Sequence, residues 1–337
     1  MSGGVDSSVA AALLLDAGHE VVGVTMKLWG GEADRGCCSV SDVDDARWVA
    51  DRLGIEHHVF NFTDEFTRHV VGPYVEAHAA GLTPNPCIEC NRHLKFDRLV
   101  RRARALGFDL VATGHHARLV PTDAGPRLAR GRDRAKDQSY VLAVVPPAVL
   151  GSCLFPVGEL TKDEVRAVAA ERGLVTAAKP DSQDVCFITR AEGRRAFLAG
   201  RLEVHPGTVR DTRGRVVGRV DAVELVTIGQ RKGLGLAGGS RPRYAVAVDV
   251  AARTVTVGGP EDLCVDVTPV ADWITHGDLP GRDADEVEVQ VSAHGTPAPA
   301  RLAPGEIRWR SPHRRVAPGQ TVVAYHRDRV VGAGTAG

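Results

Sequence analysis

The chain has 337 residues, enough for about two or three domains with full-sized cores. Its 43% hydrophobic and 25% charged residues are ordinary for a water-soluble protein, and no apolar run approaches the roughly 20 residues of a membrane span. Lys plus Arg equals Asp plus Glu at 42 each, which excludes a strong overall positive field; a nucleic-acid partner must therefore bind a local patch. No signal peptide precedes the first motif, and we expect a cytoplasmic monomer without a membrane partner.

The first eight residues, Met1-Ser-Gly-Gly-Val-Asp-Ser-Ser8, precede an apolar run and have the composition of a phosphate-binding loop. Gly3 and Gly4 let the backbone turn tightly and approach a ligand. A helix that begins at Ser7 or Ser8 would direct its unpaired N–H groups toward that ligand. No Gly-Lys-Ser/Thr follows, so the loop is not of the Walker A type.

Strands and helices alternate through the first half of the chain. The hydrophobic patterns predict helices at 8–16, 41–54, 64–80, 91–106 and 161–172, and strands at 20–26, 57–62 and 109–113. We expect a capping box at Ser41 and Asp44. The alternation predicts an α/β fold with a doubly wound parallel sheet covered on both faces. Such a sheet presents its phosphate loop after its first strand, so we expect a hydrophobic strand upstream of Met1.

From residue 206 onward, short Val-rich runs are separated by Gly and Asp turns, which is typical of small antiparallel sheets or barrels. The runs predict strands at 207–210, 215–218, 243–248, 254–257, 286–291, 305–310 and 320–325. We therefore expect three domains: a catalytic α/β domain at 1–200, a small β domain at 201–262 and a barrel-like β domain at 263–337.

Seven cysteines, odd in number and unevenly spaced, favour reduced thiols over a disulfide framework in such a chain. In Cys87-Ile-Glu-Cys90, a helix that starts near Asn91 and the neighbouring Arg92 would lower the pKa of the Cys90 thiol. Half of a zinc site is the alternative, although no second Cys-x-x-Cys completes it. Cys186 lies in a stretch without regular period, which predicts an exposed loop rather than a buried structural thiol.

Two basic stretches are candidate nucleic-acid contacts. The helix at 91–106 carries six Lys or Arg against Asp97 alone, with Lys95, Arg98 and Arg102 on one face. This face is either solvated or a track for a phosphate backbone. The second stretch runs from Arg308 to Arg315, where Trp309 either stacks on a base or packs in the barrel.

Eight blocks in order give the chain a resemblance to a known family. They are Met1-Ser-Gly-Gly-Val-Asp-Ser-Ser, Thr25-Met-Lys-Leu-Trp, Thr83-Pro-Asn-Pro with Cys90-Asn-Arg, Ala112-Thr-Gly-His-His-Ala-Arg, Lys136-Asp-Gln-Ser-Tyr, Phe155-Pro-Val-Gly-Glu-Leu, Asp181-Ser with Cys186-Phe-Ile, and Thr227-Ile-Gly-Gln-Arg-Lys-Gly-Leu. The chain resembles the bacterial tRNA uridine 2-sulfurtransferases, or tRNA 2-thiouridylases, over almost its whole length. The loop itself resembles that of the N-type ATP pyrophosphatases, which attach AMP to a carbonyl oxygen and then displace it.

The resemblance implies a set of site residues. Cys90 matches the family's nucleophile and Cys186 its persulfide carrier. The implied ATP contacts are Met1, Ser2, Gly3, Gly4, Val5, Asp6, Ser7, Met26 and Gly114, with Mg²⁺ balancing the phosphate charge and no metal bound by the protein alone. The implied tRNA contacts are Asn85, Pro86, Cys87, His115, Lys136, Asp137, Gln138, Arg310 and Gln320, and Trp309 joins them as the candidate from the basic stretch. Some members carry Asp at the position of Cys87, so Cys87 is either a base contact or a bystander.

The resemblance further implies ATP-dependent 2-thiolation of the wobble uridine of the tRNAs for lysine, glutamate and glutamine. Sulfur would come from a donor protein, either a cysteine desulfurase or a relay protein. The residues agree, because thiolation of a carbonyl needs a leaving group on oxygen, a sulfur-bearing nucleophile and a second thiol. Two alternatives stay open: an ATP pyrophosphatase that acts on a small molecule, and a zinc-containing RNA-binding protein.

Overall fold

The computed structural model describes residues 1–29, 40–181, 185–188, 193–237, 241–277 and 286–337. The chain divides into two compact units. Unit 1 comprises Met1–Val70, Cys87–Ala191 and Asp328–Val330, and unit 2 comprises Val71–Pro86, Glu192–Arg327 and Val331–Gly337. The division into three domains expected above stays a prediction.

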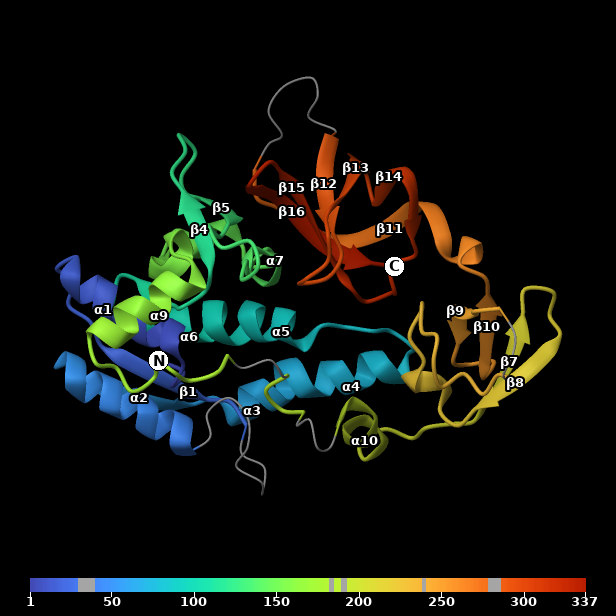
Figure 1. Cartoon of the computed structure of the whole chain (residues 1–337), viewed down its shortest axis with the longest axis horizontal. Coiled ribbons are helices and arrows are strands. Elements are labelled where there is room, and N and C mark those ends of the chain that lie inside the picture. The colour runs from blue at the N-terminus through green and yellow to red at the C-terminus, as the bar shows by residue number, and fades with distance from the viewer. Residues whose placement is uncertain (30–39, 182–184, 189–192, 238–240, 278–285) are drawn as a thin grey trace. The chain divides into compact units, whose positions relative to one another are not determined.

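Unit 1 is built from parallel strand pairs with helices between them (Figure 1). Strand β1 (Gly23–Lys27) pairs in parallel with β2 (His57–Asn61), and β3 (Val111–Ala112) pairs in parallel with β6 (Cys153–Leu154). Parallel strands need crossover connections, and the helices of this unit supply them. The predicted α/β class is confirmed.

The predicted helices of unit 1 lie close to their expected positions, and short helices that were not predicted occur at 139–142, 147–150 and 156–159. Their bounds are α1 (Val5–Asp16), α2 (Val40–Leu53), α3 (Thr63–Phe66), α5 (Pro86–Glu89), α6 (Leu99–Ala105), α7 (Ser139–Leu142), α8 (Pro147–Leu150), η3 (Pro156–Glu159, a 3₁₀ helix) and α9 (Lys162–Glu171). Helix α2 packs on β1 and β2, α6 packs on β3, and α1 packs against α9. The apolar core between α1, α2 and α9 includes Val9, Val49 and Val165.

Two expected helix starts were wrong. Helix α1 begins at Val5, with Gly4 as its N-cap, rather than at Ser7 or Ser8. Residue 40 is already helical, so Ser41 lies inside α2 and cannot form the predicted capping box with Asp44. Local composition identifies a capping residue only if the helix starts at the next residue, and here both helices begin before the predicted caps.

Two predicted helices contain π-helical stretches. The region predicted as one helix at 64–80 is α3, then the π-helical η1 (Thr67–Val71), then α4 (Gly72–Ala79). The region predicted at 91–106 begins earlier, at α5, continues as the π-helical η2 (Cys90–Arg98) and ends as α6. Because a π-helix bonds i to i+5, side chains along η2 do not follow the i, i+4 spacing assumed from the sequence.

Unit 1 also contains a hairpin that the sequence analysis did not predict. Strand β4 (Ala117–Val120) pairs antiparallel with β5 (Arg127–Arg130). At the N-terminus, the Met1 amino group hydrogen-bonds to the Val24 carbonyl oxygen, and Thr25 Oγ1 donates to the Met1 carbonyl oxygen at 2.7 Å. The first residue is therefore held directly against β1.

Unit 2 contains two β modules. In the first, β7 (Gly207–Asp211), β8 (Val216–Val220), β9 (Tyr244–Asp249) and β10 (Thr254–Gly258) form a sheet of order β8-β7-β10-β9. One pair, β7 with β10, is parallel, so this module is not wholly antiparallel. Its core is Val-rich, and helix α10 (Gly193–Ala199) and the 3₁₀ turns η4 (Val223–Leu225) and η5 (Glu261–Leu263) accompany it.

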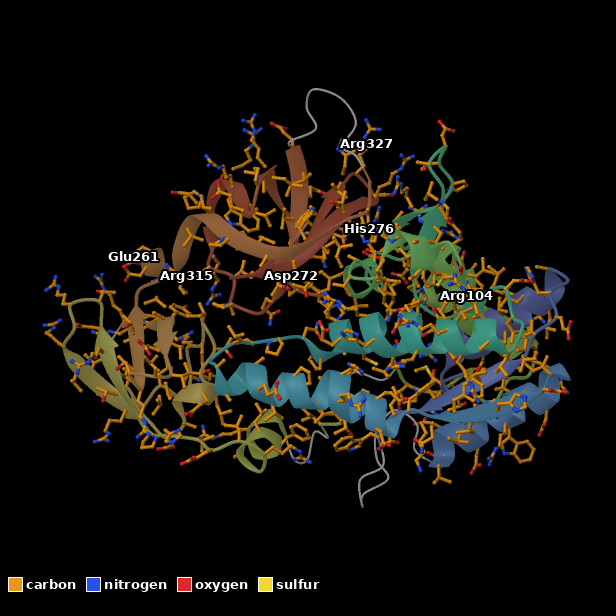
Figure 2. All side chains as sticks on the ribbon, turned by 180° about the vertical axis from the view of Figure 1, so that it is seen from behind. Arg104, Glu261, Asp272, His276, Arg315 and Arg327 are labelled. Carbon is orange, nitrogen blue, oxygen red and sulfur yellow. The ribbon has the colours of Figure 1, made fainter. Side chains whose placement is uncertain are left out.

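The second β module is a closed barrel (Figure 1). Its strands are β11 (Cys264–Thr275), β12 (Glu286–Gln290), β13 (Ala298–Ala303), β14 (Glu306–Arg314), β15 (Thr321–His326) and β16 (Arg329–Ala336). The order is β11-β14-β13-β12-β15-β16, and β11 pairs again with β16 to close it. Closure removes the exposed sheet edges. His276, labelled in Figure 2, is 1% exposed at the end of β11.

Across the ranges that the structure describes, no helix combines the length and the apolar character that a membrane span needs.

Candidate active site

The predicted phosphate loop curls over the start of helix α1. Gly3 has φ of +68°, and a Cβ there would lie 2.3 Å from the Asp42 carbonyl oxygen, so only glycine fits. The Ser2 backbone N–H donates to Ser7 Oγ at 3.1 Å, and Ser7 Oγ donates to the Gly4 carbonyl oxygen at 3.1 Å. With glycine as the N-cap, no capping side chain competes for the first N–H groups of α1. Such N–H groups attract anions.

The other residues predicted to bind ATP surround this loop. A Cβ on Gly114 would lie 2.5 Å from the Ser7 backbone nitrogen, so the backbone at 114 rests directly on the loop. Met26 lies in β1 beside Thr25, which holds Met1. Val5, at 3% exposure, points into the core and positions the loop. Unit 1 thus brings together segments from three parts of the sequence.

Asp6, in the first turn of α1, is the centre of an ion cluster that the sequence analysis missed. Lys162 Nζ donates to Asp6 Oδ1 at 2.7 Å and to Oδ2 at 2.8 Å, and His116 Nε2 lies 3.1 Å from Oδ1. Burial raises the pKa of Asp6, but the hydrogen bonds from His116 and Lys162 outweigh burial and lower it overall. Asp6 is therefore ionised at neutral pH.

Lys162 also joins this cluster to the segment that leads to Cys186. Its Nζ lies 2.8 Å from Asp181 Oδ1, and Asp181 also pairs with Lys136 at 2.8 Å and with Arg166 at 3.0 Å. Burial raises the pKa of Asp181, yet the bonds from Lys136 and Lys162 lower it to about 2. A sequence signal existed: Lys162 is the first residue of α9, where the positive end of the helix dipole disfavours a cation unless anions lie nearby.

The charges beside the loop suit a polyphosphate. Lys162, Lys136 and Arg166 provide three cations that could bind phosphate oxygens; the carboxylates of Asp6 and Asp181 pair with them, and Asp133 adds a third negative charge beside Lys162 and Lys136. His116 Nδ1 is buried and has no hydrogen-bond partner among the described residues. A nucleotide phosphate fits this donor set, and a divalent cation would bind with the phosphates rather than to the protein alone.

His115 does not lie at the surface expected of a tRNA contact. It is 7% exposed, its Nδ1 lies 2.7 Å from Thr113 Oγ1, and its ring packs on Phe96 and Phe155. Burial, with a smaller contribution from Lys95, holds the pKa of His115 well below its ordinary value. His115 is neutral and supports the segment that carries Gly114.

The helix that carries the Cys-x-x-Cys pair begins at Pro86, not near Asn91, so that prediction was wrong. Proline favours the first position of a helix, where no N–H bond is lost. Cys87 is therefore in the first turn and exposed, whereas Cys90 lies one turn later, buried, at the start of η2. The helix dipole acts mainly on its first turn, so it does not supply the lowered pKa predicted for Cys90.

Cys186 lies in an irregular segment anchored by its neighbour. The ring of Phe187 packs against Phe66 at 5.6 Å and against Trp29 at 6.1 Å between centroids. Phe66 belongs to α3, which packs against η2, the element that starts at Cys90. The segments of both predicted catalytic cysteines thus adjoin α3. Cys186 is half-buried rather than fully exposed as expected.

The remaining described cysteines lie elsewhere. Cys153 is buried in β6 and donates to the Val149 carbonyl oxygen at 3.3 Å, and burial raises the pKa of its thiol to about 12. Cys264 is exposed in β11, and Cys37 and Cys38 lie outside the described residues. In the part of the chain that the structure describes, no group of three or more His, Cys, Asp or Glu could hold a metal ion.

The residues predicted to contact tRNA fall into separate groups. Lys136 is ion-paired with Asp181 as described, and Gln138 Oε1 accepts from the His116 backbone N–H at 2.9 Å. Asp137 holds Arg130 at 3.1 Å and has a side chain only 5% exposed, so it supports the turn. Asn85 and Pro86 precede Cys87 at the start of α5.

In the barrel, the predicted tRNA residues are engaged with the protein. Trp309 is 7% exposed, donates from Nε1 to Thr268 Oγ1 at 2.9 Å and stacks on His313 at 3.8 Å, an arrangement that corresponds to the packing alternative. Arg310 pairs with Glu286. Gln320 Nε2 donates to the Thr83 carbonyl oxygen.

The predicted basic helix is more heavily paired than its composition suggested. Arg101 pairs with Asp97 at 2.5 Å, and Arg104, labelled in Figure 2, donates to Ser152 Oγ at 2.5 Å. The Arg102 guanidinium lies over the ring of Phe60 at 5.3 Å.

Comparison with known proteins adds an independent observation. Three family descriptions match in order: "tRNA methyl transferase HUP domain" at residues 1–190, "tRNA methyl transferase PRC-barrel domain" at 195–259, and "Aminomethyltransferase beta-barrel domain" at 269–336. A solved structure of NMN synthetase from Francisella tularensis is 16% identical, covers 54% of this chain and 64% of that one, and has a TM-score of 0.33. That score is too low to bear on the fold.

Curated relatives match over nearly the full length. The tRNA-specific 2-thiouridylase MnmA of Mycolicibacterium smegmatis is 50% identical, over 97% of this chain and 94% of the relative. The proteins of the same name from Roseiflexus sp. and Chloroflexus aggregans are 45% and 47% identical, over 99% of this chain and 97% and 96% of theirs. At this identity and coverage, no large segment of the chain is left without a match in these relatives. The chain therefore belongs to the tRNA-specific 2-thiouridylase family, within the ATP pyrophosphatases that share its phosphate loop.

Proposed function

We propose that this enzyme uses ATP to replace the C2 oxygen of the wobble uridine of tRNA with sulfur. The observation that carries the proposal is the phosphate loop with Gly114 against it and Lys162 joining Asp6 to Asp181, five residues before Cys186. Activation and sulfur transfer would thus use neighbouring segments of unit 1. Family membership and the names of the relatives support tRNA as the substrate.

The first step is adenylation. The C2 carbonyl oxygen attacks the α-phosphorus of ATP, an O–P bond forms, and pyrophosphate leaves with the electron pair of the broken P–O bond. The N–H groups at the start of α1 and the Lys162 ammonium would stabilise the charge on the phosphates. Mg²⁺ bound with ATP would supply further charge neutralisation.

The second step is sulfur transfer. The outer sulfur of a Cys186 persulfide attacks C2, and AMP leaves with the former carbonyl oxygen. The Cys90 thiolate attacks the Cys186 sulfur, so the persulfide S–S bond breaks and its electron pair stays with the sulfur on tRNA. The product enzyme holds a Cys90–Cys186 disulfide, and an external thiol reductant must return both thiols. A cysteine desulfurase or a relay protein would then reload Cys186, and the tRNAs for lysine, glutamate and glutamine are the proposed substrates.

Cysteine exchange tests this division of labour. Cys186→Ser should abolish loading of labelled sulfur onto the protein, whereas Cys90→Ser should load sulfur but not release it into tRNA. Both variants should retain ATP binding, because neither cysteine belongs to the phosphate loop. Thiolation of tRNA by Cys186→Ser at a near wild-type rate, or turnover without reductant that yields no Cys90–Cys186 disulfide, contradicts the proposal.

Cys87→Ser is the matched control. Cys87 is exposed in the first turn of the same helix as Cys90, so its replacement should keep much of the activity. Loss of activity together with loss of a stoichiometric metal would instead support the zinc alternative. Pyrophosphate release driven by a small molecule, with none driven by tRNA, would support the other alternative.

A further inference from the structure

The first β module of unit 2 contains a hollow of about 550 Å³. It is lined by Arg194 and Arg195 of helix α10, by Leu225, and by the segment Thr227–Gln230. This segment begins the Thr227-Ile-Gly-Gln-Arg-Lys-Gly-Leu block, to which neither the phosphate loop nor the cysteines give a role. The size of the hollow suits a small ligand or one unit of a polymer.

The segment that lines the hollow is rigidly built. The Thr227 N–H donates to Gln230 Oε1 at 3.1 Å, and the Gln230 N–H donates to the Thr227 carbonyl oxygen at 2.9 Å. Gly229, with φ of +82°, donates its N–H to the Ala245 carbonyl oxygen at 2.7 Å. The turn is therefore tied to strand β9 and is formed before any ligand arrives, which lowers the entropic cost of binding.

The charge around the hollow is positive and poorly compensated. Among the described residues, no carboxylate lies within 4 Å of the charged groups of Arg194, Arg231 or Lys232, all exposed. Arg195 lies 3.5 Å from Asp221, whose side chain is 96% exposed, so that pairing is weak. The residues from 193 to 262 carry twelve Lys or Arg against seven Asp or Glu, although the whole chain is neutral.

We propose that this hollow is an additional RNA contact, in which Arg194 and Arg195 bind a backbone phosphate and Leu225 and Ile228 receive the adjoining ribose or base. Guanidinium groups bind phosphate in paired hydrogen bonds, and an apolar floor beside them suits a nucleotide better than a carboxylate side chain. The inference rests on the proposed function, because it assigns the site to the same tRNA substrate.

The test is tRNA binding by the variant Arg194→Ala with Arg195→Ala across a salt series. Loss of one or two phosphate contacts should reduce the slope of log Kd against log salt by about 1 to 2 and weaken binding roughly tenfold at moderate salt. Arg213→Ala with Arg241→Ala removes the same charge from the same module outside the hollow and should leave the slope within experimental error of wild type. Arg194→Lys with Arg195→Lys should restore most of the slope.

Each outcome decides the inference. An unchanged slope for Arg194→Ala with Arg195→Ala, or equal losses in the two alanine doubles, overturns the inference. If that variant keeps its tRNA affinity and loses thiolation only when a protein supplies the sulfur, the hollow binds an acidic protein instead. Thermal unfolding of each variant must match wild type, which the exposure of both arginines predicts. Failure of the proposed function is seen separately, since wild type itself would then neither bind nor thiolate tRNA.

Discussion

Lys162 is a single side chain that joins the phosphate loop to the segment leading to Cys186. Its side chain is only 10% exposed, and its ammonium lies between two carboxylates, Asp6 and Asp181, at 2.7 and 2.8 Å. Desolvation of such a pair offsets much of its attraction, so the pair contributes less to stability than its short distances alone would indicate. Under the proposed function, this ammonium would exchange a carboxylate for a phosphate oxygen when ATP binds.

We expect Lys162→Met to lower the rate of tRNA-dependent pyrophosphate release roughly 100-fold, because a charged donor to the transferring phosphate is lost. Lys162→Arg should recover part of that loss. Lys179→Met is the matched control, since Lys179 also pairs with two carboxylates, Asp42 and Asp45, outside the loop. Similar rates for the Lys162 and Lys179 methionine variants would show that Lys162 acts only in folding.

Asp181 makes an acid-dependent contribution to stability. Its pKa falls from 3.8 to about 2 in the fold, so the carboxylate stabilises the protein fully above pH 4 and loses that effect as the pH falls toward 2. The size of the shift corresponds to about 2 kcal/mol. The gap in unfolding temperature between wild type and Asp181→Asn should therefore be largest near pH 5 and should shrink toward pH 2. A gap that stays constant across that range would contradict the assigned ion pairs.

In the helix from Pro86 to Ala105, the type of helix decides which side chains share a face. Its π-helical stretch, η2, buries Asn91, whose Nδ2 donates to the Val141 carbonyl oxygen at 3.1 Å. The α-helical spacing returns only at α6, so Arg98 and Arg102 still share a face, four residues apart. Arg101 and Arg104 are engaged by Asp97 and Ser152, and the Arg102 guanidinium lies over the ring of Phe60.

We expect Arg98→Glu with Arg102→Glu to weaken tRNA binding in a strongly salt-dependent way while ATP binding holds, because two phosphate contacts become repulsive. Arg101→Glu with Arg104→Glu makes the same charge change on the same helix. Binding measured over a salt series separates the two doubles. Equal effects would mean that only net charge matters, and unchanged affinity of the first double would return its arginines to a solvated face.

At the scale of the whole chain, two compact units with separate cores predict more than one thermal transition. ATP with Mg²⁺ should raise only the transition of unit 1, because a ligand stabilises the unit that binds it. Trp309→Ala should lower only the transition of unit 2, since its indole is buried in the barrel core. Calorimetry of wild type with and without ATP and Mg²⁺, and of Trp309→Ala, measures these transitions. A single transition that the ligand and the substitution both shift would contradict the division into two units.

Local pattern by itself predicted the α/β class, the phosphate loop and most helices of unit 1. It also placed the helix that starts after Thr161, where Thr161 and Glu164 form a complete capping box. These features depend on residues that are close together in the sequence: the spacing of hydrophobic residues, the glycine at position 3 and the residues that cap helices. The motifs also identified Cys90 and Cys186 as candidate catalytic residues, a hypothesis that the cysteine variants test.

Tertiary structure decided what depends on residues far apart in the chain. Lys162 meets Asp6 across 156 positions, and Phe187 meets Phe66, although neither pairing leaves a periodic trace in the sequence. The burial of His115 and Trp309 likewise follows from packing. Short-range preferences amount to fractions of a kcal/mol per residue, so long-range burial overrides them wherever the two conflict.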